Sequence, residues 1–148
     1  MLKKTGIVGA LFILIYSCGN NSNEKSISAL KEDNKLAIAE GLELFESNCI
    51  SCHSPNASME NRLAPPMIAV KKHYLEEGMT LEDFTKDILA FVKNPSEDKS
   101  KMPGALRRFN LMPKMNFSDD QLTKIATYIF FSDIEKPVWF DKHYNERH

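Results

Sequence analysis

"CISCH", from Cys49 to His53, is the stretch of sequence that decides how this chain folds. It places two thiols three positions apart and an imidazole directly after the second thiol. Three kinds of site use such a group: a redox-active dithiol, one half of a zinc site, and the attachment point of a haem. The sequence on either side of the motif must therefore decide between these three kinds of site.

The context of the motif favours haem. A thioredoxin-like dithiol expects a βαβ unit and a zinc site expects a second pair of ligands, and neither context is present. Two thiols at this spacing can form thioethers with the vinyl groups of one haem, while the next histidine lies beneath the iron. Cys49 and Cys52 are thus predicted to hold one covalent haem c and His53 to be an axial ligand, although so short a motif also recurs by chance.

The stretch "GLELFESNCISCH", residues 41–53, resembles class I (monohaem) c-type cytochromes. In that family a glycine and an aromatic residue lie eight and four positions before the first cysteine, where the first and last helices cross. Gly41 and Phe45 occupy these positions, and Tyr128 in "IATYIF" matches the aromatic partner on the last helix. The resemblance covers roughly residues 35–133 and implies an all-α fold, with long loops wrapped around one covalent haem.

The resemblance also implies what holds the haem iron and its histidine ligand. Pro65, twelve residues after His53, matches the proline whose carbonyl oxygen accepts a hydrogen bond from the axial histidine. Ala64 stands where the family usually has glycine. Met112 precedes Pro113 in the loop before the last helix and matches the methionine that supplies the sixth iron ligand.

Other side chains are alternatives for the sixth ligand. Met102 also precedes a proline, and Met115 lies three residues nearer the last helix. Any one methionine is more often core filler than ligand, so Met112 is preferred over these two on its position alone. The histidines outside the motif are less favoured as ligands; they are His73, His143 and His148.

Three segments have helical patterns. Residues 35–48 carry apolar residues at spacings of three and four. Residues 80–93 begin with a capping-type Thr80 and carry an apolar stripe, and residues 118–131 begin with Ser118 and Gln121 at capping-box spacing. The intervening residues 54–67 and 94–116 are rich in Pro, Ser and Asn and are predicted to be loops.

The N-terminus indicates export. Lys3 and Lys4 precede an apolar run, residues 7–16, that is too short to span a bilayer. The sequence up to Cys18 resembles a bacterial lipobox, which implies lipidation of Cys18; an ordinary signal peptide with an incidental cysteine is the alternative. "GNNSNEKS" after Cys18 lacks an acidic run, so a periplasm-facing membrane anchor is expected.

These observations predict four parts of the chain. Residues 1–17 are a signal peptide of lipoprotein type, residues 18–34 are the lipid-anchored cysteine and a flexible polar tether, and residues 35–133 are the cytochrome c domain. Residues 134–148 are a C-terminal tail with Trp139, Phe140 and Tyr144, which is expected to pack back on the domain.

The expected function is electron transfer and not enzymatic catalysis. Histidine and methionine on both axial positions would leave the iron no open site, so one electron would pass to and from redox protein partners in a respiratory chain. Nucleic acid is not an expected partner, because 19 basic residues face 20 acidic ones without a basic cluster.

Two alternative functions stay open. Without a methionine ligand, the chain would be a five-coordinate haem sensor or a peroxidase-like enzyme, with Arg107, Arg108 and His73 as candidate distal groups. It could also serve as a haem subunit of a larger respiratory complex.

Overall fold

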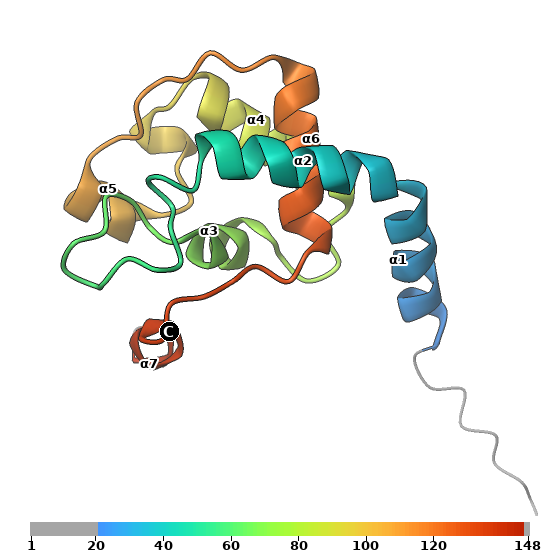
Figure 1. Ribbon diagram of the computed structural model, residues 1–148, viewed down its shortest axis with the longest axis horizontal. Coiled ribbons are helices and arrows are strands. Elements are labelled where there is room, and N and C mark those ends of the chain that lie inside the picture. Colours follow the sequence, from blue (N-terminus) through green and yellow to red (C-terminus); the bar gives the residue numbers. More distant parts are fainter. Residues whose placement is uncertain (1–20, 147–148) are drawn as a thin grey trace, which may run out of the picture.

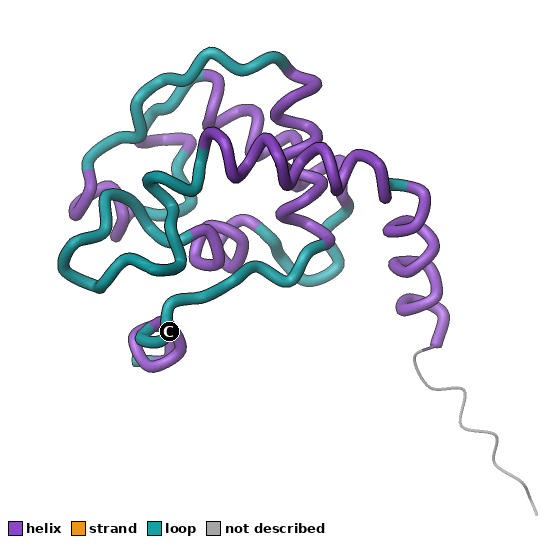
Figure 2. Tube along the Cα trace, in the orientation of Figure 1, coloured by secondary structure: helices purple, strands orange, loops and turns teal. Residues whose placement is uncertain are grey.

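A computed structural model describes residues 21–146, with side chains from residue 26 onward. Over this range the chain is helical and contains no strand, as Figures 1 and 2 show, and the predicted all-α fold is confirmed. The elements are α1 Asn21–Asp33, α2 Lys35–Asn48, α3 Met67–Tyr74, α4 Leu81–Lys93, the short 3-10 turn Glu97–Lys99, α5 Pro103–Phe109, α6 Asp119–Phe131 and α7 Phe140–Asn145.

The crossing of α2 and α6 organises the domain (Figure 1). At Gly41 the two backbones approach so closely that a Cβ atom there would lie 2.1 Å from the carbonyl oxygen of Lys124. The rings of Phe45 and Tyr128 pack beside this contact with centroids 5.4 Å apart. Only glycine permits this approach, so the crossing predicted from Gly41, Phe45 and Tyr128 is the crossing observed.

Both ends of α6 are held by side chains. Ser118 accepts a hydrogen bond from the backbone N–H of Gln121, and the Gln121 side chain accepts one from the Ser118 N–H, completing a capping box. At the other end the Lys71 ammonium donates to the carbonyl oxygens of Phe130, at 3.1 Å, and Ser132, at 2.7 Å. Lys71 comes from α3, so this contact both caps α6 and attaches α3 to it.

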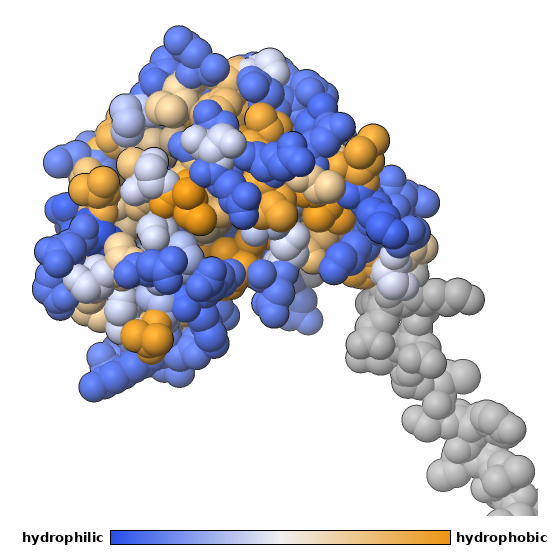
Figure 3. Space-filling model, viewed as in Figure 1, coloured by the Kyte–Doolittle hydropathy of each residue, from blue (hydrophilic) through white to orange (hydrophobic). Residues whose placement is uncertain are grey.

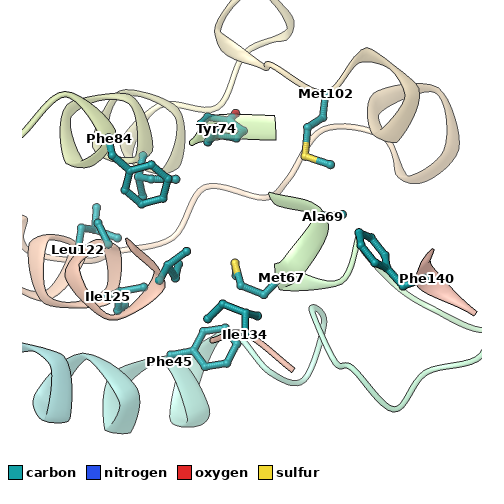
Figure 4. Packing of buried hydrophobic residues seen from close by; sticks show 13 residues of the cluster. Phe45, Met67, Ala69, Tyr74, Phe84, Met102, Leu122, Ile125, Ile134 and Phe140 are labelled. Carbon is teal, nitrogen blue, oxygen red and sulfur yellow. The ribbon is translucent and has the colours of Figure 1, made fainter. Parts of the chain in front are cut away.

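The hydrophobic core lies between α6 and the helices that cover it (Figure 4). Phe84 of α4 is fully buried and its ring packs edge-on against Phe130, with centroids 5.6 Å apart. Figure 4 shows Phe45, Met67 and Ile134 meeting on the other side of α6. The buried apolar residues of α6 include Leu122, Ile125 and Ile129.

The polar segment predicted to be a flexible tether is a helix over most of its length. Helix α1 points away from the domain beyond the N-terminal end of α2 (Figure 1). Good helix formers in "ALKED", residues 29–33, account for the helical conformation. The prediction of a flexible tether relied on the low apolar content of the segment and did not consider helix propensity. The predicted signal segment and Cys18 lie outside the described residues. Within residues 21–146 no helix is both long and apolar enough to cross a membrane.

After α6 the C-terminal tail runs back below α3 to α7 (Figure 1). Its Phe140 is 2% exposed and stacks on Tyr144, with ring centroids 5.5 Å apart. The indole N–H of Trp139 donates to the carbonyl oxygen of Ala57 at 3.1 Å. The tail therefore holds the loop that follows the CISCH motif.

Candidate cofactor site

A cavity of about 210 Å³ lies beneath the CISCH turn. Its walls come from the end of α2, from α3 and α4, and from the segment between residues 100 and 117. The cysteine, histidine and methionine side chains that line it are Cys49, Cys52, His53, Met102, Met112 and Met115. Most of the other lining residues are apolar and include Val70, Tyr74, Ile88, Phe91, Val92, Leu106 and Phe117.

The chain turns sharply at the end of α2 to bring the motif to this cavity. The backbone N–H of Cys49 donates to the Phe45 carbonyl oxygen at 2.8 Å, and the N–H of His53 donates to the Cys49 carbonyl oxygen at 2.9 Å. The turn thus puts two thiols and one imidazole along a single wall. Both cysteines are free thiols.

The environment of Cys49 argues against a redox-active dithiol. Burial raises the pKa of the Cys49 thiol to about 11, and the neighbouring Cys52 adds to the increase. Reactive dithiols instead have an attacking cysteine whose pKa is lowered, because the thiolate is the nucleophile. Within residues 21–146 no group of three or more His, Cys, Asp or Glu side chains could hold a metal ion.

His53 is oriented by the loop that follows it. Its Nδ1 lies 2.7 Å from the carbonyl oxygen of Pro65, and the backbone N–H of Met67 donates to the His53 carbonyl oxygen at 3.3 Å. Because a carbonyl oxygen only accepts, Nδ1 carries the proton and Nε2 keeps its lone pair. Ala64, in place of the family's glycine, does not prevent this hydrogen bond.

Burial also sets the protonation state of His53. It lowers the pKa of the imidazole, and the hydrogen bond to Pro65 offsets part of that effect. The ring is therefore neutral at pH 7, which is the form that binds metal ions.

The three candidate methionines all line the cavity. Met102 is 8% exposed and belongs to the hydrophobic core, whereas Met115 is 36% exposed. Met112 is half-buried and lies in the extended segment before α6. The fold thus brings Met112 to the same cavity as His53, together with both rivals.

The other candidate groups lie elsewhere. His73, Arg107 and Arg108 line a second groove, as does His143, and none of the four lines the cavity beneath the CISCH turn. His148 is outside the described residues.

Sequence reasoning missed the apolar walls of the cavity. Val70 and Tyr74 face it from α3, four residues apart, and Phe91 and Val92 face it from α4. The i, i+4 spacing of Val70 and Tyr74 was a signal for a helix face, but the segment is short and follows two prolines. These walls, two thiols, one neutral imidazole and thioether sulfurs together suit a haem, which is apolar except at its carboxylates.

The fold and the site together fit one class of protein: small all-helical domains that hold a haem covalently. Comparison with protein families agrees with this class. The family model described as Cytochrome c matches residues 38–130, more than half of the chain. The chain therefore belongs to the cytochrome c family, whose members bind haem c covalently and generally carry electrons. No curated protein and no solved structure matches it.

Proposed function

We propose that this protein carries one electron at a time on a single haem c, attached through Cys49 and Cys52 with His53 and Met112 as axial ligands. The observation that carries the proposal is the hydrogen bond from His53 Nδ1 to the Pro65 carbonyl oxygen, in a cavity that also contains both thiols and Met112. That bond presents Nε2 as an iron ligand in a fixed orientation.

The bound haem would supply reversible one-electron chemistry at its iron. A thioether ligand from Met112 is soft and favours the ferrous state, so it raises the reduction potential. Tyr74, Ile88 and Phe91 exclude water from the site and further disfavour the more highly charged ferric state. Two protein ligands leave no position for a substrate, in keeping with a carrier.

Exposed apolar residues surround the opening of the cavity. Leu63 is 70% exposed, Leu111 40% and Met115 36%, and all three line the cavity. The face of the molecule shown in Figure 3 is mixed, with apolar residues scattered among polar ones. A small group of exposed apolar residues at the cavity fits a transient redox protein partner, whose interface would bury less than about 1,200 Å².

The proposed location follows from the sequence. A lipid on Cys18 would anchor the exported chain to a membrane, facing the periplasm, where the protein would serve a respiratory chain. Helix α1, polar and projecting from the domain, would separate the haem domain from that anchor. A stable subunit of a respiratory complex would have the same features and would co-purify with its partners.

The experiment is to express the chain without its signal segment together with haem-maturation machinery, then to record ferric and ferrous spectra with and without carbon monoxide. We expect a covalent c-type spectrum, a reversible one-electron couple and no response to carbon monoxide in the wild type. Met112→Ala should bind carbon monoxide, while Met115→Leu should not.

Other results would contradict the proposal. Binding of carbon monoxide by the wild type would show an open iron site and favour a sensor or a peroxidase. The position of Arg107, Arg108 and His73 in the second groove speaks against the peroxidase, because the described residues that line the haem cavity include no Arg, no Lys and no His other than His53. A chain without covalent haem would exclude all these functions.

A further inference from the structure

The backbone of Asn110 is strained. Its φ is 64° and its ψ is −171°, and in the part of the chain that the structure describes it is the one residue other than glycine with a positive φ. Residues found at this combination of angles are nearly all glycines, because a Cβ atom is crowded by the backbone there. Strain of this kind persists only where the surrounding structure holds the residue, and it is commonest at functional sites. Asn110 lines the haem cavity.

Asn110 connects α5 to a segment that we call the Met112 segment, residues 111–117. The segment leads to Ser118, the N-cap of α6. No hydrogen bond attaches it to any other residue within residues 21–146. Its contacts are made by side chains that line the cavity, among which Met112 and Phe117 are half-buried. The path of the segment therefore depends on the residues at its two ends.

The chain is held on both sides of Asn110. On the side of α5, the Asn110 N–H donates to the Leu106 carbonyl oxygen at 3.0 Å, and the Arg108 guanidinium donates to the Met59 carbonyl oxygen. On the other side, Met112 lines the cavity only two residues further along the chain. A rotation about the Asn110 backbone would therefore carry the Met112 thioether away from the cavity.

We propose that Asn110 is a positioning residue for the sixth iron ligand: its backbone directs the Met112 segment over the cavity, and its strain weakens the hold of that segment. The inference rests on the proposed function, because Met112 is the ligand that is positioned. The strain is released when the segment moves away from the cavity. The closed position is therefore less favourable than it would be with glycine at this residue.

Two substitutions separate the backbone of Asn110 from its side chain. Asn110→Gly removes the Cβ atom and with it the strain, whereas Asn110→Ala keeps the Cβ atom and removes only the amide group. Asparagine tolerates a positive φ better than alanine does, so the strain in Asn110→Ala is at least as large as in the wild type. A role of the backbone thus predicts different effects of the two substitutions, and a role of the amide group predicts the same effect.

The first readout is the affinity of the ferric, haem-loaded protein for imidazole, which competes with Met112 for the iron and is followed by absorption. Asn110→Gly should weaken imidazole binding about fivefold, because relief of the strain stabilises the closed segment and the freedom of glycine in the open segment offsets only part of this. Asn110→Ala should bind imidazole as tightly as the wild type or more tightly.

Gly78→Ala is the matched control. Gly78 has a φ of 76°, no atom lies within 4 Å of the position of its Cβ, and it does not line the haem cavity. The substitution therefore adds backbone strain of the same kind at a distance from the Met112 segment. Its affinity for imidazole should equal that of the wild type.

Lys114 provides a second readout, which does not depend on the iron ligand. It is exposed within the Met112 segment, and trypsin cleaves after lysine when the surrounding chain leaves its folded position. The initial rate of cleavage after Lys114 in the haem-loaded protein, followed by mass spectrometry, should fall in Asn110→Gly. It should not fall in Asn110→Ala or in Gly78→Ala.

The inference is overturned if Asn110→Ala weakens imidazole binding as much as Asn110→Gly does, or if Asn110→Gly changes neither the affinity nor the rate of cleavage. Failure of the proposed function gives a different result. If Met112→Ala binds imidazole no more tightly than the wild type, Met112 is not the ligand, whereas slower cleavage of Asn110→Gly after Lys114 would still support Asn110 as the residue that positions the segment.

Discussion

At the scale of single residues, the site depends on which groups are kept neutral. Burial lowers the pKa of His53 and raises those of Cys49 and Tyr74, and in each case the uncharged form is favoured. A neutral imidazole is the form that binds metal ions, and an uncharged wall would surround a bound haem. The same burial that keeps His53 neutral would thus also keep its surroundings apolar.

Tyr74 should make the protein less stable in alkali. Burial raises the pKa of its phenol above the ordinary value, while a hydrogen bond from the Lys101 N–H opposes this in part. The unfolded chain then loses this proton at about pH 10, before the folded protein does, so the free energy of unfolding falls as pH rises above that value. In denaturant titrations of the haem protein from pH 8 to 11, Tyr74→Phe should show a smaller fall than the wild type. An equal fall in both would show that Tyr74 is not responsible.

At the scale of the elements, two contacts join helices that are distant in sequence. Gly41 permits α2 and α6 to cross, and Lys71 joins α3 to the C-terminal end of α6. Both contacts involve backbone atoms of α6. The pattern of apolar and polar side chains along α6 therefore does not predict them completely.

Gly41→Ala should destabilise the protein. Its Cβ would lie 2.1 Å from the Lys124 carbonyl oxygen, so the helices would have to move apart at a cost of about 1–3 kcal/mol. The matched control is Gly104→Ala in α5, whose nearest atom would be the Arg107 guanidinium nitrogen at 3.8 Å. We expect thermal unfolding to show a lower midpoint for Gly41→Ala and an unchanged or higher one for Gly104→Ala. Equal midpoints would contradict the close crossing.

Lys71→Met should loosen the end of α6. The substitution keeps the length of the side chain but removes the donor to the Phe130 and Ser132 carbonyl oxygens, which costs about 1–3 kcal/mol. Lys86→Met, on the exposed side of α4, should change the free energy of unfolding little. Denaturant unfolding distinguishes the two, and equal effects would argue that the Lys71 cap does not stabilise the helix.

At the scale of the whole molecule, the C-terminal tail contacts the loop that orients His53, the proposed axial ligand. Trp139 donates to Ala57, and the backbone of this loop continues to Pro65, which accepts from His53. Trp139 lies beyond the residues that the family model matches, which end at residue 130.

Trp139→Phe tests this contact, because it removes the indole donor and keeps an aromatic ring against Arg62. Amide hydrogen exchange over residues 54–64 should become several-fold faster, as expected for the loss of about 1 kcal/mol of local stability. Exchange in α4 should stay the same. Unchanged exchange in the loop would show that the tail does not hold it.

Much of this structure was predictable, for identifiable reasons. Gly41, Phe45 and Tyr128 mark the helix crossing because close packing restricts which residues fit, and Ser118 with Gln121 marks a helix start because capping needs those side chains. The sequence therefore contains recognisable residues at the helix crossing and at the start of the last helix.

Other parts lacked such a signal. Helix α3 follows Pro65 and Pro66 and is only eight residues long, and α5 begins with Pro103 and Gly104, which are typical of a turn. The second groove combines Arg62, Arg107 and His143, which are brought together only by the tertiary fold. No local pattern could have indicated it.

X-ray absorption fine structure at the iron edge of the ferric protein tests the central claim most directly. With His53 and Met112 as axial ligands, the iron should have five nitrogen neighbours and one sulfur neighbour. The sulfur should be lost in Met112→Ala and retained in Met102→Leu and Met115→Leu. A wild-type spectrum without sulfur, or a sulfur neighbour that persists in Met112→Ala, would contradict the proposed ligation.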